Sequence, residues 1–165
     1  SVKDEKIKLS KNQKNKFFIQ LENLMTELAT MIVKDGEGAS KFIKVKVRGA
    51  KSINDAKVVA RSIANSPLVK TAIAGSDANW GRIVMAIGKS GVEIDSKKIS
   101  IKFGKFTILK SPKNLLYGNL SKIDKYLKKK EIEITVKIGD GQSEWTIYTC
   151  DLTQKYITIN KDYRT

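Results

Sequence analysis

The stretch IKVKVRGAKSINDAKVVARSIANSP, residues 43–67, holds the pattern on which the fold depends. Apolar residues alternate with basic ones over positions 43–48, which is the period of a half-buried strand. Ser52 and Asp55 then have the spacing of a capping box, and apolar residues follow at helical spacing as far as Pro67. A strand followed directly by a capped helix predicts a mixed α/β protein.

The segments on the N-terminal side predict an arm and a long helix. Residues 1–16 are polar and rich in lysine, so we expect an arm there. Residues 17–32 are expected to form a helix with one apolar stripe, which ends at Asp35-Gly36. This apolar stripe consists of Phe17, Leu21, Leu24, Met25, Leu28 and Ile32.

The segment after Pro67 is expected to form a strand and then a helix. LVKTAIAG at 68–75 has the composition of a buried strand. A helix is expected over 80–88, with Ser76 or Asp77 as its cap.

The remaining segments predict further strands and two short helices. β-Branched residues and short breaks between 92 and 109 favour two or three strands, and 121–130 favours a short helix. Residues 132–138 and 144–152 have strand patterns on either side of a glycine-rich turn, so we expect a hairpin. For the last residues we expect a short helix with Thr153 as its cap.

The order of these elements predicts the domain organisation. No internal repeat or linker is evident. We therefore expect residues 1–16 to be an arm and residues 17–165 to form a single α/β domain. Its sheet should be mainly antiparallel and flanked by helices.

Composition excludes several classes of catalytic and structural site. The 165 residues contain no histidine and one cysteine, so this chain alone cannot supply a Ser-His-Asp or Cys-His site, an internal disulfide or an ordinary zinc site. We expect no metal and no bound organic cofactor. The apolar runs are far shorter than the roughly 18 residues needed to cross a bilayer. With no leader pattern at the start, this predicts a soluble protein without a targeting segment.

The formal net charge of +15 raises the question of a nucleic-acid partner. Only four of the 32 basic residues are arginines, and lysine is the poorer residue for bidentate recognition of phosphates and bases. The lysines are spread along the chain, with higher density at residues 3–16 and 122–130. We therefore regard nucleic acid as an unlikely partner; a solvated surface or an acidic partner chain also accounts for the charge.

Three segments contain candidate chemistry. DGEGAS at 35–40 leaves Glu37 between two glycines, as a solvated turn residue or as a carboxylate open to a small cation. The segment 74–82 is either a capped helix start or an anion site with Arg82. The tail 160–165 is either a frayed end or part of a binding site.

Together these segments resemble one family. DGEGAS, VKTAIAGSDANWGRIVMAIG at 69–88 and TCDLTQKYITINKDYRT at 149–165 are similar, in order and spacing, to the C-terminal part of the ornithine acetyltransferases. These enzymes, also called glutamate N-acetyltransferases, belong to arginine biosynthesis. The resemblance covers the chain from about residue 17 onward and implies the α/β fold of that family, which the terminal-nucleophile aminopeptidases share. Ser40 and Ala78 depart mildly from the family pattern, which usually has threonine and proline there.

The resemblance implies a precursor that cuts itself before a threonine, which becomes the nucleophile. This sequence begins with Ser1 and resembles the family only beyond that threonine. We therefore expect no catalytic residue in this chain and place the nucleophile and oxyanion hole on a missing polypeptide. A terminal threonine uses its own amine as base, so the lack of histidine is compatible with this chemistry.

The resemblance also implies substrates, partners and a location. Glu37, Asn160 and Thr165 match the family positions that bind the amino-acid substrate. The implied reaction moves acetyl from N-acetylornithine to glutamate in a ping-pong cycle, with acetyl-CoA as a further possible donor. Partners are the N-terminal (alpha) chain and the nucleophile-bearing segment, in a heteromer of dimerised alpha-beta units in the cytoplasm. A basic nucleic-acid-binding module and a peptidase of the same wider fold remain alternatives.

Overall fold

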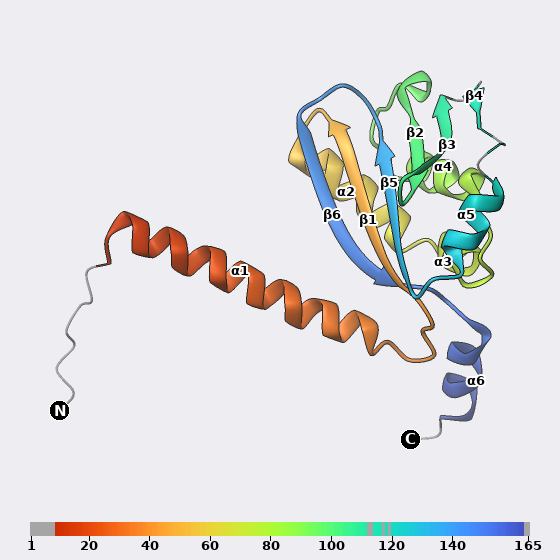
Figure 1. The fold of residues 1–165 in the computed structure, drawn as a ribbon, viewed down its shortest axis with the longest axis horizontal. Helices are drawn as coiled ribbons and strands as arrows, with labels where there is room; N and C mark the ends of the chain where they lie inside the picture. The colour runs from red at the N-terminus through yellow and green to blue at the C-terminus, as the bar shows by residue number, and fades with distance from the viewer. Residues whose placement is uncertain (1–8, 112–113, 117, 119, 164–165) are drawn as a thin grey trace. The chain divides into compact units, whose positions relative to one another are not determined.

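The computed structural model describes residues 9–111, 114–116, 118 and 120–163 (Figure 1). The chain forms two compact units that divide between Ile32 and Val33. Helix α1 (Lys11–Lys34) contains all described residues of the first unit apart from Leu9 and Ser10, and its last two residues belong to the second unit. None of its residues is buried. This confirms the expected helix. It begins at Lys11, inside the region expected to be an arm.

The second unit contains a six-stranded sheet in its described residues, in the order β4-β3-β2-β5-β1-β6. Only β1 and β5 pair in parallel, and the other neighbouring strands pair antiparallel, so the expected mainly antiparallel sheet is confirmed. The strands are β1 (Phe42–Ala50), β2 (Ser100–Phe103), β3 (Phe106–Ser111), β4 (Asn114–Leu115), β5 (Glu131–Lys137) and β6 (Ser143–Cys150).

The expected hairpin of the last two strands is wrong, although both strands exist. β1 lies between β5 and β6 and pairs with each of them. The turn therefore crosses over the end of β1, where Gly141 donates a backbone hydrogen bond to the Gly49 carbonyl at 3.1 Å. A Cβ atom at Gly141 would lie 1.9 Å from the Ala50 carbonyl oxygen, so the glycines serve a close backbone crossing, not a tight hairpin.

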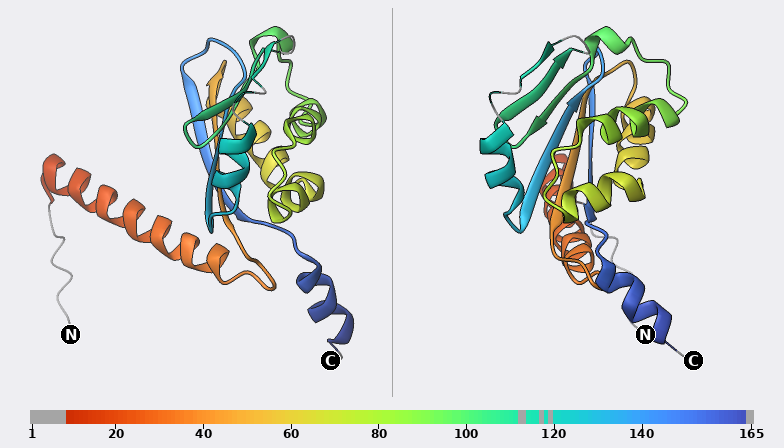
Figure 2. Two further views of the ribbon diagram at one scale, coloured as in Figure 1. Left: turned by 45° about the vertical axis from the view of Figure 1, so that its right-hand side comes forward. Right: turned by 90° about the vertical axis from the view of Figure 1, so that its right-hand side faces the viewer.

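Helices α2 (Ile53–Ala64), α3 (Pro67–Ala74) and α4 (Trp80–Lys89) cover one face of the sheet (Figure 2). The expected strand at 68–75 is wrong because this segment is α3. The Ser66 side chain accepts a hydrogen bond from the Val69 N–H, and Pro67 occupies the first turn, so the segment has a complete helix start. Asn79, not Ser76 or Asp77, caps α4.

The remaining elements are short. They are the 3₁₀ turn η1 (Ser96–Lys98), α5 (Leu120–Leu127) and α6 (Gln154–Asp162), which begins after Thr153 as expected. α5 packs against β2 and β3. No helix of the described residues has both the length and the apolar character to cross a membrane.

The core lies between the sheet and helices α2 to α5. Ile43, Val45 and Val47 of β1 are at most 1% exposed, and the alternating basic residues lie on the opposite face of the strand, as the pattern predicted. On that face Lys44 pairs with Glu133 at 3.1 Å, and Lys46 pairs with Glu144 at 2.8 Å. The buried apolar side chains drive this packing, which fixes the ends of β1 and β6 where the candidate site lies.

Candidate functional site

Two of the three predicted substrate-binding residues lie together in the structure. The Nδ2 atom of Asn160 donates a hydrogen bond to Oε2 of Glu37 at 3.0 Å and another to the Tyr156 carbonyl at 2.9 Å. Glu37 comes from the loop before β1, and Asn160 comes from the last turns of α6. Both residues are exposed, so a ligand can approach a carboxylate and an amide in one place. Thr165 lies outside the described residues.

Gly38 permits this contact because the DGEGAS loop passes directly over the start of α6. Its φ is +67°, and a Cβ atom there would lie 2.5 Å from the Tyr156 nitrogen. The Thr153 hydroxyl donates to the Gly38 carbonyl at 2.6 Å. The Thr153 side chain makes no capping hydrogen bond to α6. It binds the DGEGAS loop to the start of that helix instead.

Asp151 also connects the DGEGAS loop to the segment before α6. It is 3% exposed and is the only buried polar or charged residue in the described part of the chain. Its carboxylate accepts hydrogen bonds from the backbone N–H groups of Ser40 and Lys41, at 2.8 and 2.9 Å, and from the Ser40 hydroxyl. The residue lies directly between β6 and α6, so it links the loop that carries Glu37 to the helix that carries Asn160.

Lys41 connects the DGEGAS loop to the second motif. Its Nζ atom donates to the Ile73 carbonyl at 2.6 Å and to the Ser76 hydroxyl at 2.7 Å, at the end of α3. Burial lowers the pKa of Lys41 below its usual 10.5, while the nearby charge of Asp151 acts in the opposite direction. The contacts are those of a lysine that holds two loops together.

The motif around Trp80 has the geometry of a capped helix start. The Asn79 side chain accepts from the Arg82 N–H at 3.2 Å, and the Arg82 guanidinium donates to the Leu68 carbonyl at 2.9 Å and to the Thr71 hydroxyl at 3.2 Å. Arg82 is therefore used to bind α4 to α3. These contacts favour the structural interpretation of segment 74–82 over an anion site.

The sequence did not single out Lys41 and Asp151. Each is a charged residue next to a strand end, which is an ordinary place for a solvated charge. Neither residue carries a local sequence signal of its role, and Asp151 lies in an ordinary TCDLT segment. Only the folded chain shows that three hydrogen-bond donors converge on it.

The arrangement can bind a small polar ligand but holds no recognisable catalytic group. Glu37 can pair with an ammonium group, and the amide of Asn160 can donate to or accept from a carboxylate or acetamide. In the described residues no group of three or more histidine, cysteine, aspartate or glutamate side chains could hold a metal ion. The two residues thus form an exposed pair of a carboxylate and an amide at the surface.

Comparisons with known proteins identify the family of the chain. The family model named ArgJ matches residues 3–165. The Arginine biosynthesis bifunctional protein ArgJ of Caulobacter vibrioides is 47% identical over 145 residues, which are 88% of this chain and 36% of that protein. The protein of the same name from Bartonella henselae is 51% identical over 149 residues, or 90% of this chain and 36% of that protein.

A solved structure shows the same fold. The crystal structure of Arginine biosynthesis bifunctional protein argJ from Bacillus halodurans superposes with a TM-score of 0.87 at 38% identity, covering 93% of this chain and 72% of that chain. This chain spans about 36% of the length of the two curated relatives. Because the family model covers nearly all of its residues, the chain belongs to the ArgJ family.

Proposed function

We propose that this chain is the C-terminal part of an acetyltransferase that moves acetyl from N-acetylornithine to glutamate. The observation that carries the proposal is the hydrogen bond between Asn160 and Glu37. It brings two family-matched positions, from opposite ends of the α/β unit's sequence, to one exposed place. The names of the ArgJ relatives, which refer to arginine biosynthesis, support the same substrate class.

In this proposal each site residue has a distinct role. The Glu37 carboxylate pairs with an ammonium group of ornithine, and Asn160 satisfies the amino-acid carboxylate or the acetamide. Thr165 adds a hydroxyl to the same pocket. Lys41 and Asp151 hold the loop in place but do not touch substrate.

The nucleophile belongs to another segment of the same precursor. A threonine hydroxyl attacks the acetamide carbon of N-acetylornithine, its proton passes by way of the terminal amine to the leaving nitrogen, and ornithine departs. The amine of glutamate then attacks the acetyl ester and restores the hydroxyl. This ping-pong cycle needs the precursor to cut itself before the threonine. Acetyl-CoA as a second donor stays a prediction.

The exposed helix α1 supports a heteromer. Leu24, Met25 and Leu28 of the apolar stripe are 47–58% exposed, and an apolar face of this kind is typical of a surface that a partner covers. We propose that the N-terminal chain of the precursor covers it, in a heteromer of dimerised alpha-beta units. A cytoplasmic location, where amino-acid biosynthesis takes place, belongs to the same proposal.

Reconstitution tests the function. The purified chain alone should transfer no acetyl from N-acetylornithine to glutamate, and transfer should appear when the N-terminal polypeptide with its threonine is supplied. Intact mass of every copurifying polypeptide identifies the partner and the cleavage site. Transfer by the isolated chain, or its absence in the complete complex, would contradict the proposal. Hydrolysis of peptide amides by the complex, without acetyl transfer, would favour the peptidase alternative.

A further inference from the structure

The outer edge of β6 has no neighbouring strand in the described part of the chain. β6 is the last strand of the sheet and is eight residues long (Figure 1). The strand at the opposite edge, β4, has only two residues. Proteins protect long edge strands from pairing by placing lysine or proline there or by covering them. β6 contains neither residue type, in a chain with 32 lysine and arginine residues, so its own sequence does not protect this edge.

Every second residue of β6 directs its backbone N–H and C=O groups away from the sheet. The Asp151 N–H donates to the Lys41 carbonyl at 3.1 Å, at the position that continues the register between β1 and β6. Hydrogen-bonded and non-hydrogen-bonded pairs alternate along an antiparallel ladder. Residues 145, 147 and 149 therefore bond to β1, and the backbone groups of Thr146 and Tyr148 point outward. Within the described residues, neither of these two forms a backbone hydrogen bond with a segment other than β1.

The side chains of β6 are also incompletely buried. Alternate residues of β1 and β5 are buried, whereas no residue of β6 is. Trp145 is 38% exposed although it pairs with the buried Val47 and so faces the helices. Ile147 on the same face packs against the core but is only half-buried. A further strand beside β6 would cover these apolar side chains, which adds hydrophobic stabilisation to the backbone hydrogen bonds.

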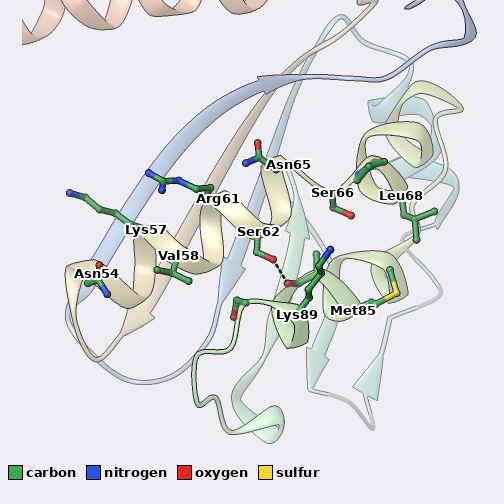
Figure 3. Close-up of a pocket in the computed structure, with 13 residues that line it drawn as sticks. Asn54, Lys57, Val58, Arg61, Ser62, Asn65, Ser66, Leu68, Met85 and Lys89 are labelled. Carbon is green, nitrogen blue, oxygen red and sulfur yellow. Dashed lines mark hydrogen bonds between the residues drawn. The ribbon is translucent and has the colours of Figure 1, made fainter. Parts of the chain in front are cut away.

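Positive charge flanks this edge on the helical side. Figure 3 shows the Lys57 and Arg61 side chains on the opposite side of α2 from Lys89. This is the side on which α2 meets β6, because the Lys57 ammonium lies 4.1 Å from the centre of the Trp145 ring. Arg61 forms no ion pair in the described part of the chain. A strand that pairs with β6 therefore suits this place best when it carries an acidic side chain on the side of α2.

The same charges disfavour a second copy of this chain at the edge. An antiparallel pair of two β6 strands in one continuous sheet has a twofold axis perpendicular to the sheet, so both α2 helices lie on the same face. Lys57 and Arg61 of the two copies would then approach each other. No carboxylate would lie between them, because Glu144 is the only charged residue of β6 and pairs with Lys46 and Arg48.

We propose that the outer edge of β6 pairs with an extended segment of the N-terminal chain of the precursor, and that this segment carries an acidic side chain on the side of α2. The inference rests on the heteromer proposed above. This chain spans about 36% of the length of two curated relatives, so in a precursor of that length the N-terminal chain is long enough to supply a strand. The backbone groups of Thr146 and Tyr148 provide the hydrogen bonds of this strand addition.

Hydrogen exchange of the complete complex, resolved to single amides, tests the pairing. The Trp145 and Ile147 amides face β1 and serve as internal references. We expect the Thr146 and Tyr148 amides to exchange within about tenfold of these references, since an amide without a partner exchanges much faster. Fast exchange of Thr146 and Tyr148 beside slow references would overturn the proposal. Protection that disappears when the complex is diluted into single alpha-beta units would also overturn it, because the partner would then be a second copy.

A substitution at Thr146 tests the outward backbone donor. Thr146→Pro removes this N–H, and proline is tolerated in an edge strand where the N–H does not face the sheet. In the complete complex it should weaken the association of the two chains by at least about fivefold, because a hydrogen bond between them is lost. The control Thr146→Val keeps the N–H and the branched shape, so association should stay unchanged. Equal association of the two variants would contradict pairing at this edge.

A matched pair of charge variants tests the acidic side chain. Arg61→Gln should weaken the association of the two chains by about two- to fivefold at low salt, as expected for an exposed ion pair. Lys89→Gln removes the same charge on the other side of α2 and should have no effect. Equal effects of the two variants would overturn the acidic part. Acetyl transfer by a complex with unprotected β6 amides would overturn the strand pairing alone. Protected amides in a complex without acetyl transfer would support the pairing and contradict the proposed reaction.

Discussion

Asn160 donates a hydrogen bond to the Glu37 carboxylate across 123 positions of the sequence, at a distance of 3.0 Å. Neither residue is buried, so this contact does not hold the fold together. It depends on the backbone beneath it, where Asp151 and Thr153 bind the DGEGAS loop to the start of α6. The relationship therefore gives two testable consequences for binding and one for stability.

Replacing Glu37 tests its role in binding substrate ammonium. In the complete enzyme Glu37→Gln should lower kcat/KM for N-acetylornithine by roughly tenfold to a hundredfold, since a charge-assisted hydrogen bond contributes about 1.5–3 kcal/mol. The melting temperature should change little because Glu37 is exposed. Glu93→Gln is the control, because the Glu93 side chain is 96% exposed and lies 3.7 Å from its nearest lysine. An unchanged kcat/KM in Glu37→Gln would make it an ordinary turn residue.

Substituting Asn160 and deleting the tail test whether the C-terminus belongs to the site. Asn160→Ala should reduce ornithine affinity by about 1–3 kcal/mol, because a substrate group is left unpaired. Deleting residues 160–165 should abolish acetyl transfer while most of the folding stability remains, since the large core residues lie in the sheet and in α2 to α5. Equal ornithine affinities of the complete and truncated complexes, at one pH and salt concentration, would remove the tail from the site.

Substituting Asp151 tests which contacts hold the DGEGAS loop in place. Asp151→Ala leaves two partly buried backbone N–H groups without their acceptor, so the complete protein should lose about 1–3 kcal/mol of stability. Asp151→Asn keeps an oxygen acceptor for these groups and should lose clearly less. Denaturant unfolding of both variants measures the difference. If the two variants lost the same stability, the hydrogen bonds to Ser40 and Lys41 would not be the reason for burying this carboxylate.

The lowered pKa of Asp140 should make the stability of the protein depend on pH in the acid range. Hydrogen bonds from Lys137 and Lys98 lower the pKa of Asp140 from 3.8 to about 2, and the bond from Lys137 has the larger effect. Because the folded state binds the proton less tightly than the unfolded state, the contribution is present above about pH 3.8 and is lost as the pH falls toward 2. The difference in melting temperature between the native protein and Asp140→Asn should follow this window.

High salt provides the control for Asp140. The carboxylate and both lysines are about half exposed, so added salt should reduce the difference between the native protein and Asp140→Asn. A difference that stays constant from pH 5 to roughly pH 2 would show that the ion pairs do not contribute to stability.

Sequence pattern alone determined the elements whose period is local. The alternation over residues 43–48 identified β1 and its buried face, and the spacing of Ser52 and Asp55 identified the start of α2, where the Ser52 hydroxyl accepts from the Asp55 N–H at 3.1 Å. The same local rule failed at 68–75, because a short, mostly apolar segment fits a buried strand and a buried helix equally. The capping contact of Ser66 decided for the helix.

Only the tertiary structure decided which strands pair and which site residues meet. Strand patterns give the buried face but not the neighbour, so β1 could lie between β5 and β6 without any signal in their sequences. The motifs nominated Glu37 and Asn160 by resemblance, and the fold brought them within 3.0 Å. Lys41 and Asp151 gave no local signal because their roles come from hydrogen-bond partners that are 32 to 111 positions away in sequence, and contacts over such separations exist only in the folded chain.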